Sequence, residues 1–403
     1  MKKIYVHKLI LLFVLFFAQL QNTFAQQDST ISLKKHHIGI FAPLFLDSVF
    51  NAAGSFKMKT GFPKFAMPGM DFIQGAQIAL DSMVIFNNDV DAHFFDTKSY
   101  HEPIPTLIKN GKLDSLDLII GSVKDVEFKQ LAAFAQKKNI PFISATYPND
   151  GGITQNPYVV ILNSTLKAHC EAIFTYIMEN HGTEADKIIL LRKKGAQEDK
   201  VATYFKMKNE QEGKELFKYK VINIDSTFSS DKLKKSLDST KQNIIIGGSL
   251  DESFAGQITT AAFDLSSSYP IKLFGMPNWD GFKTLTGKND FEDFPIYFTS
   301  PYYNEKTDTY SRILTNGYLK RYKSRPTDMS FKGFESTYLF TKLLLSYPND
   351  MINHLNDSKF TIFSDFNFKP VNSGPNATFP DYFENKHLYF IRLMNGTTTN
   401  SWW

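Results

Sequence analysis

The stretch LDLIIGSVKDVEFKQLAAFAQKKNIPFISATYPND, from Leu116 to Asp150, decides the fold of this 403-residue chain. It contains two short apolar runs, Leu118–Gly121 and Pro141–Ser144, which are too brief for helices and are bounded by turn residues. Between these runs, apolar residues recur at helical spacing from Val126 to Ala135. The pattern therefore predicts a strand, a helix and a second strand. Fully apolar strands are typical of a parallel sheet with helices on both faces.

Small polar residues follow both predicted strands. Gly121 and Ser122 come after the first strand, and Ala145 and Thr146 come after Ser144 at the end of the second. Parallel strands end at the same edge of a sheet, and ligands of open α/β sheets bind outside that carboxyl edge. We therefore expect Ser122, Ser144, Ala145 and Thr146 to offer hydroxyl and backbone groups to a small polar ligand. Each hydroxyl could equally serve a helix cap or a turn.

The same alternation of strand and helix runs through most of the chain and restarts once. The first series extends from His37–Phe41 to Tyr158–Leu162, and the second extends from Lys187–Leu191 to Ile271–Phe274. Two such series in tandem predict an α/β fold of two doubly wound, Rossmann-like lobes. Past Gly275 strands and helices no longer alternate regularly. Helices are predicted at Thr309–Tyr322 and Phe334–Ser346. Two strands, interpreted as a hairpin, are predicted at Phe360–Phe368 and Leu388–Leu393.

Further candidate ligand-binding residues follow strand ends in the second half of the chain. Glu252 comes shortly after the predicted strand Asn243–Gly247. Its carboxylate could face the ammonium group of a ligand, or it could serve the first turn of its own helix. Trp279 and Tyr302 also follow predicted strands. Their rings could stack on a ligand or pack inside a hinge.

The N-terminus predicts export. Three lysines lie at the start of the chain, and the apolar run Leu9–Phe17 follows them. A short segment with small residues then leads to the predicted cleavage position after Ala25. This order is typical of a cleavable secretory signal peptide, here Met1–Ala25, because the apolar run is too short to span a bilayer. An uncleaved membrane anchor is the alternative. No cysteine lies near the predicted cleavage site, so we expect no lipoprotein anchor, no membrane span after signal removal and a periplasmic location.

The charge argues against a nucleic-acid-binding protein, and the cysteine content excludes an internal disulfide. The formal net charge is +4, and three of the positive residues lie in the predicted signal peptide. The remaining chain is close to neutral, which gives no electrostatic footprint for nucleic acid. Cys170 is the single cysteine, so no internal disulfide can form. Its apolar neighbours predict a buried thiol in a helix.

No standard catalytic motif is present in the sequence. The chain lacks G-x-S-x-G, H-E-x-x-H and paired C-x-x-C patterns, so we expect neither an enzyme nor a cofactor. His36 and His37 open the first strand beside Lys34 and Lys35. A solvated lead-in is favoured there over a metal site, because no other histidine lies at metal-ligand spacing along the chain.

Several segments resemble the type I periplasmic binding proteins of the branched-chain amino acid receptor kind. IPFISATY (Ile140–Tyr147) is similar to that family's I-P-x-I-S-x-x-A/T segment, and IIIGGSLDE (Ile244–Glu252) is similar to its Gly-Gly turn followed by a glutamate. The other similar segments are MPGMDFIQGAQIALDSM (Met67–Met83), LDLIIGSV (Leu116–Val123), IKLFGMPNW (Ile271–Trp279) and RYKSRPTDMSFKGFESTYLF (Arg321–Phe340).

The resemblance implies two lobes joined by a three-stranded hinge that close over a solute, for uptake through an ABC permease or for sensing. By this analogy Ser122 and Ser144–Thr146 would hold the carboxylate and amine of an amino acid, and Glu252 would bind the amine from the other lobe. The implied division is lobe I at Lys34–Leu162 plus Trp279–Ser358, and lobe II at Asn163–Asn278 plus Lys359–Trp403.

The chain also departs from the family pattern. Ser122 stands where the family often has proline, Val123–Asp125 replaces small hydroxyl residues, Arg192–Gln197 lacks an aromatic-glycine pattern, and Gly333–Glu335 replaces Gly-Tyr-Asp. These departures leave the amino-acid specificity open. They motivate a second hypothesis, a cell-envelope interaction or scaffold protein with a protein or peptidoglycan partner that keeps the fold without solute transport. This sequence more closely resembles a Bacteroidetes-type cell-envelope variant of the family. That variant is often fused to LysM modules, and no LysM module is present in this sequence.

Overall fold

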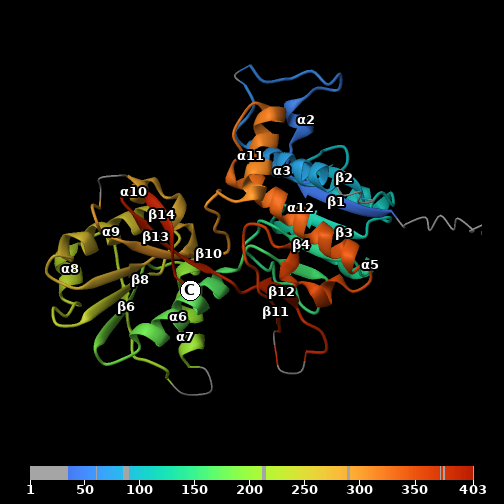
Figure 1. Cartoon of the computed structure of the whole chain (residues 1–403). Coiled ribbons are helices and arrows are strands. Elements are labelled where there is room, and N and C mark those ends of the chain that lie inside the picture. The colour runs from blue at the N-terminus through green and yellow to red at the C-terminus, as the bar shows by residue number, and fades with distance from the viewer. Residues whose placement is uncertain are drawn as a thin grey trace, which may run out of the picture. The chain divides into compact units, whose positions relative to one another are not determined.

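Two seven-stranded sheets, each mostly parallel, form the centres of two lobes (Figure 1). The computed structural model describes residues 35–59, 61–84, 90–210, 215–287, 291–372, 374 and 377–402. The predicted signal peptide, Met1–Ala25, lies outside the described residues. None of the described helices is both long enough and apolar enough to cross a membrane.

The first sheet has the strand order β11-β12-β5-β4-β3-β1-β2. Its strands are β1 (His36–Ala42), β2 (Val90–Asp96), β3 (Leu118–Gly121), β4 (Phe142–Ser144), β5 (Val159–Ile161), β11 (Phe368–Val371) and β12 (Tyr382–Asn385). The helices of this lobe are α2 (Leu46–Val49), α3 (Met67–Val84), α4 (Ile104–Lys109), α5 (Asp125–Lys138), α11 (Thr309–Tyr322), α12 (Asp328–Ser346) and the 3-10 turns η3 (Met351–His354) and η4 (Ser358–Phe360).

The second sheet has the strand order β14-β13-β10-β9-β8-β6-β7. Its strands are β6 (Asp186–Arg192), β7 (Lys220–Asn223), β8 (Gln242–Gly247), β9 (Ile271–Phe274), β10 (Ile296–Ser300), β13 (Tyr389–Met394) and β14 (Thr397–Trp402). The helices of this lobe are α6 (Leu166–His181), α7 (Ala196–Asn209), α8 (Ser230–Lys234), α9 (Glu252–Leu265), α10 (Lys283–Thr286) and the 3-10 turn η2 (Pro277–Gly281).

The strand–helix–strand unit predicted from Leu116–Asp150 is confirmed. Strands β3 and β4 pair in parallel with Gly121 opposite Ser144, and all residues of both strands are buried. Helix α5 between them ends at Asn139, which adopts the left-handed conformation that commonly terminates a helix. Both sheet faces are covered, as the apolar strands predict, since Ile120 packs in the cluster with α3 and α12 while Ile119 packs in the cluster with α5. Cys170 is buried within α6, as predicted.

The chain crosses between the lobes three times, which confirms the expected three-stranded hinge. The crossings follow β5, β10 and β12. The first and third are joined by hydrogen bonds: the Ser164 hydroxyl donates to the Asn385 carbonyl at 2.6 Å, and the Thr165 amide donates to a Glu384 carboxylate oxygen at 2.7 Å. At the second crossing, Thr299 Oγ1 lies 2.7 Å from Nδ1 of the buried His169 on α6.

The lobe boundaries expected from the resemblance need correction at two of these crossings. Strand β10 belongs to lobe II, because Ile296 pairs in parallel with Leu273, so the second crossing follows Ser300 rather than Asn278. Strands β11 and β12 belong to lobe I, because β12 pairs in parallel with β5. The third crossing therefore follows Asn385 rather than Ser358, and the predicted hairpin of Phe360–Phe368 with Leu388–Leu393 is wrong. Sequence alternation identifies strands but does not identify their partners.

Helices α3 and α12 pack backbone against backbone over the first sheet. A Cβ placed on Gly75 would lie 2.0 Å from the Ser330 carbonyl oxygen, and one placed on Gly333 would lie 2.0 Å from the Phe72 carbonyl oxygen. Only glycine permits so close an approach. Helix α12 begins at Asp328, earlier than the predicted Phe334, because Thr327 and Ser330 form a capping box.

We predict that Gly333→Ala lowers the free energy of unfolding by about 1–3 kcal/mol or more, because the added methyl group overlaps backbone that cannot rotate away. Denaturant titration of the purified protein measures this change. Gly256→Ala on α9 is the matched control, since its Cβ would meet Thr284 at an ordinary 3.5 Å. That variant should gain about 0.5–1 kcal/mol from helix propensity. Equal effects of the two substitutions would contradict the close packing of α3 on α12.

Candidate functional site

Residues that follow four neighbouring strands line a pocket at the carboxyl edge of the first sheet. Thr97 follows β2, Pro43 follows β1, Ser122 follows β3 and Thr146 lies just beyond β4. The pocket has a volume of about 210 Å³, and the remaining lining residues are Lys98, Val123, Lys124, Glu127, Tyr147 and Pro148. The sheet order thus brings together Ser122 and Thr146, two of the residues predicted from sequence.

Asp96 fixes the loop on one side of this pocket. Its carboxylate accepts hydrogen bonds from the backbone amides of Leu44, Phe45 and Leu46, at 2.9, 3.1 and 2.7 Å, and from the amide of Lys98 at 2.9 Å. Phe45 adopts a left-handed conformation there, with φ of 56°. The bonds from Leu44, Phe45 and Leu46 tie the loop after β1 to the end of β2, so the Asp96 carboxylate holds this wall of the pocket.

Hydroxyl groups and a charged pair give the pocket its polar character. Ser122 Oγ and Thr146 Oγ1 lie 3.1 Å apart. The Lys98 ammonium group forms an ion pair with the Glu127 carboxylate, and both side chains are partly buried. Hydroxyl groups can donate to or accept from a ligand, an ammonium group attracts a carboxylate, and a carboxylate attracts an ammonium group. The set therefore matches a small molecule that carries both charges.

Ser144 and Ala145 lie beside this edge but are fully buried. The Ser144 hydroxyl has no hydrogen-bond partner among the described residues. The Ala145 amide donates to the Gly121 carbonyl at 2.9 Å, and the Ala145 carbonyl accepts from the Tyr302 hydroxyl at 2.6 Å. The backbone groups of Ala145 are thus engaged within the protein, in contrast to the predicted ligand contact.

The second-lobe candidates contact their own lobe. Glu252 is the first residue of α9, and one of its carboxylate oxygens accepts from the Thr284 amide of the neighbouring helix α10 at 3.1 Å. The carboxylate thus contacts α10, and its hydrogen bond is not to the first turn of its own helix. Trp279 is fully buried, and its indole N–H donates to the Ser249 carbonyl at 2.9 Å. The expectation that Trp279 stacks on a ligand is therefore corrected: its ring packs in the core of the second lobe.

Tyr302 belongs to the second crossing, where a larger pocket of about 500 Å³ is lined by residues of the hinge and α12. The Lys332 ammonium group lies 4.5 Å from the centre of the Tyr302 ring. Glu335 accepts hydrogen bonds from the Ser364 amide at 2.7 Å and the Ser364 hydroxyl at 3.2 Å. Burial raises the pKa of Glu335 to about 8 and lowers the pKa of Lys332. Because its hydroxyl donates to the Ala145 carbonyl, Tyr302 connects the second crossing to the edge of the first sheet.

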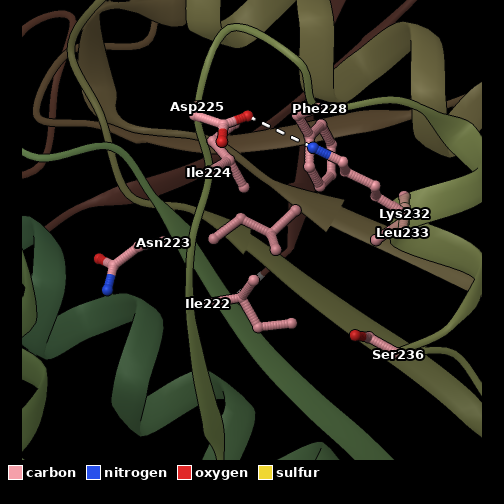
Figure 2. A pocket seen from close by; sticks show the side chains of 9 residues that line it. Ile222, Asn223, Ile224, Asp225, Phe228, Lys232, Leu233 and Ser236 are labelled. Carbon is pink, nitrogen blue, oxygen red and sulfur yellow. Dashed lines mark ion pairs between the residues drawn. The ribbon is translucent and has the colours of Figure 1, made fainter.

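A third pocket, between the end of β7 and α8 in the second lobe, is smaller (Figure 2). Its volume is about 100 Å³, whereas pockets for small ligands usually measure about 300–1,000 Å³. Apolar side chains including Ile222, Phe228 and Leu233 line it, and Asp225 and Lys232 form an ion pair at 3.5 Å. Its volume is too small for a complete small-molecule site, and the exposed Asp225–Lys232 pair lies at its rim.

Sequence reasoning missed Lys98 and Glu127. A signal exists in the sequence, because Val90–Phe95 alternates as a strand does and is followed by the polar residues Asp96 and Thr97, the same kind of strand end that points to Ser122. Placing Lys98 beside Glu127 required the strand order, in which β2 and β3 both pair with β1. That order is not readable from the local pattern.

Comparison with known proteins identifies the family to which this chain belongs. A family model described as "Periplasmic binding protein" matches residues 95–359, more than half of the chain. A comparison with curated protein sequences found no significant match.

Solved structures with a similar fold span nearly the whole chain. The substrate binding protein LivJ of a branched-chain amino acid transporter from Streptococcus pneumoniae, in complex with isoleucine, is 17% identical, with 91% of this chain and 98% of that chain covered and a TM-score of 0.50. A branched chain amino acid ABC transporter periplasmic ligand-binding protein from Burkholderia xenovorans is 11% identical, with 89% and 90% covered and a TM-score of 0.56. An ABC transporter substrate-binding protein from Desulfitobacterium hafniense in complex with Leu is 10% identical, with 91% and 99% covered and a TM-score of 0.53. At these identities the similarity establishes the two-lobe type I fold.

We predict that the free energy of unfolding falls as pH rises from about 4.5 to about 8, because of Glu335. The native state holds a proton on this buried carboxyl up to its pKa of about 8, whereas the unfolded chain releases it near the ordinary glutamate value of 4.5. Between these two pKa values the native state binds more protons than the unfolded state, so a rise in pH favours the unfolded state. The free energy of unfolding should fall by on the order of 2–5 kcal/mol in total.

Glu335→Gln should flatten this pH dependence, which denaturant titration at a series of pH values measures. Glu179→Gln, at an exposed position on α6, is the matched control and should follow the unmodified protein. A slope in Glu335→Gln equal to that of the control would contradict the assignment of a proton to Glu335.

Proposed function

Because this chain belongs to the periplasmic binding protein family, we propose that it is an exported solute-binding protein that closes over a small polar molecule of the amino-acid class. It would act in the periplasm after removal of Met1–Ala25, deliver its solute to an ABC permease or a sensor, and catalyse no reaction. The observation that carries the proposal is the meeting of Ser122 and Thr146, 3.1 Å apart, in a pocket formed by four strand ends.

The charges beside these hydroxyls favour a zwitterion. Lys98 and Glu127 already pair with one another, so the edge of the first lobe carries both signs of charge within one pocket. A free amino acid could replace this internal pair, with its carboxylate toward Lys98 and its ammonium group toward Glu127. An apolar solute would leave the pair and both hydroxyls without new partners, which is unfavourable on desolvation.

The size of the pocket favours a site shared between two lobes. Its volume of about 210 Å³ lies below the usual about 300–1,000 Å³ of a complete small-molecule site, as expected for one wall of a larger site. Closure of the second lobe would supply the other wall, and it requires a solute that binds the closed form more tightly than the open form. Tyr302 and the Ser164–Asn385 contact lie on the crossings about which such closure would occur.

A second candidate is a cell-envelope scaffold that keeps the fold without solute transport. It is favoured by the engagement of Glu252 with the Thr284 amide and by the burial of Trp279, which leave the second lobe with fewer groups for a solute. Native mass spectrometry of freshly purified protein separates the two candidates. A bound small molecule supports the solute-binding protein, whereas an empty protein that captures peptidoglycan fragments supports the scaffold.

A thermal-shift screen of amino acids, short peptides and peptidoglycan fragments identifies the solute class, because a ligand specific to the native state raises the unfolding midpoint. The proposal expects a shift with at least one zwitterionic amino acid or short peptide. No shift with any of these compounds would argue against the first candidate.

We predict that Thr146→Val weakens binding of the identified solute by about 1–3 kcal/mol, because valine keeps the shape of threonine but removes the hydroxyl hydrogen bond. Isothermal titration calorimetry measures the affinity. Thr203→Val is the matched control, since Thr203 is exposed on α7 and its hydroxyl donates to Asp199 in the same helix. Unchanged affinity in Thr146→Val would remove the strand edge of the first lobe from the site.

Glu252→Gln tests the contribution of the second lobe. If Glu252 binds the solute ammonium group on closure, this substitution should weaken binding by about 1–3 kcal/mol, because a charge-assisted partner is lost. Calorimetry against the same solute, with the exposed Glu179→Gln as control, measures the change. An affinity equal to that of the control would confine the role of Glu252 to its contact with Thr284.

A further inference from the structure

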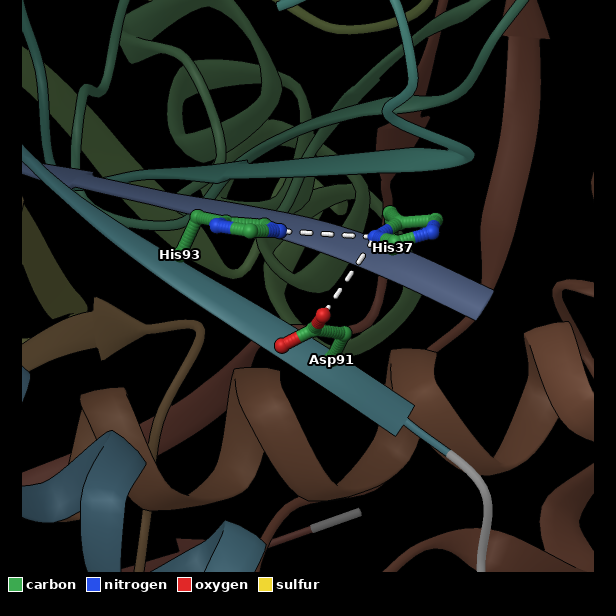
Figure 3. Close-up of side chains that lie close together, drawn as sticks. All are labelled: His37, Asp91 and His93. Carbon is green, nitrogen blue, oxygen red and sulfur yellow. Dashed lines mark hydrogen bonds and ion pairs between the residues drawn. The ribbon is translucent and has the colours of Figure 1, made fainter. Parts of the chain in front are cut away.

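Two histidines and an aspartate meet near the amino-terminal edge of the first sheet (Figure 3). His37 Nδ1 lies 3.4 Å from His93 Nε2 and 3.8 Å from an Asp91 carboxylate oxygen. One potential ligand atom from each of the three side chains lies within 4.8 Å of the others. The cluster lies on β1 and β2, at the opposite end of these strands from Thr97 and the pocket described above.

The parallel register of β1 and β2 assembles this cluster. His37 pairs with Asp91, and Gly39 pairs with His93. The rings of His37 and His93 stack, with their centroids 5.7 Å apart. The sequence alone favours a solvated lead-in at His36 and His37, because no other histidine lies at metal-ligand spacing along the chain. The second histidine comes from the neighbouring strand.

The spacing of the cluster suits a first-row divalent metal ion. Two ligands of a tetrahedral zinc ion, each about 2.0–2.1 Å from the metal, lie about 3.3–3.4 Å apart. The His37–His93 nitrogen distance of 3.4 Å matches this value, and the Asp91 oxygen, 3.8 Å from His37 Nδ1, lies slightly beyond it. Two imidazoles and one carboxylate are also the ligand types that zinc prefers, with an open position left for water.

The surroundings hold the ligands while leaving them accessible. The His37 backbone amide donates to an Asp117 carboxylate oxygen at 2.9 Å, and the His93 ring lies against Phe95. The side chains of His37 and Asp91 are 31% and 41% exposed, so an ion can reach them from solvent without opening the fold.

We propose that His37, Asp91 and His93 form a binding site for a zinc-class divalent ion that fastens the edge strand β2 to β1. The site is separate from the solute pocket, which uses the other end of the same strands. A metal ion that binds only the native arrangement stabilises it, and the stabilisation grows with the concentration of the ion.

The test measures Zn²⁺ binding to protein purified without a histidine tag. Calorimetry should show one equivalent of Zn²⁺ per chain, and Co²⁺ should give the visible absorption bands of a low-coordinate nitrogen–oxygen site. His93→Asn should weaken Zn²⁺ binding more than about tenfold, since removal even of groups that only support a ligand costs about 10- to 100-fold. Zn²⁺ should raise the unfolding midpoint of the unmodified protein but not that of His93→Asn.

Two controls keep the result specific. His101→Asn, at an exposed histidine outside the cluster, should bind Zn²⁺ like the unmodified protein. The thermal shift caused by the identified solute should be equal in His93→Asn and in the unmodified protein, which keeps this result distinct from the proposed solute binding and shows that the variant is folded. Equal Zn²⁺ affinity in the unmodified protein and in a His37→Asn/His93→Asn double variant would overturn the proposal.

Discussion

The parallel pairing of β1 with β2 on one side and with β3 on the other is the interaction on which the rest of the first lobe depends. A shift of one residue in this register would move every side chain to the other face of the sheet. At the carboxyl end the register brings Pro43, Thr97 and Ser122 to one pocket, and the pairing of β3 with β4 adds Thr146. At the amino end the same register brings His37 next to Asp91 and His93. Both sites therefore follow from one set of backbone hydrogen bonds.

The hinge depends on a second constraint. After a long stretch elsewhere in the chain, late strands return to each sheet and pair with strands from earlier in the chain. Strand β12 pairs with β5 more than two hundred residues earlier in the chain, and β10 pairs with both β9 and β13. The crossings next to these strands are short and carry hydrogen bonds to one another, such as Ser164 to Asn385. Rotation about three such segments changes few contacts, which suits a protein whose lobes close over a solute.

The sequence predicted the two-lobe α/β fold because buried parallel strands and amphipathic helices each leave a local pattern. It also predicted that Ser122 and Thr146 lie together at one edge of the sheet, since a residue just after a buried parallel strand lies at its carboxyl end. It misplaced the second and third crossings and did not predict Lys98 beside Glu127 or the histidine cluster, because each depends on which strands are neighbours. Trp279 was misassigned for a different reason: Gly247 and Gly275 leave the space that its ring fills, so an aromatic residue after a strand became part of the core.

We propose that the carboxyl edge of the first sheet recognises the solute, and a crystal structure of the protein with its bound solute tests this most directly. Solute electron density should contact the hydroxyls of Ser122 and Thr146, and the charged groups of the solute should separate Lys98 from Glu127. Solute bound elsewhere, with the Ser122–Thr146 contact and the Lys98–Glu127 pair unchanged, would contradict recognition at this edge.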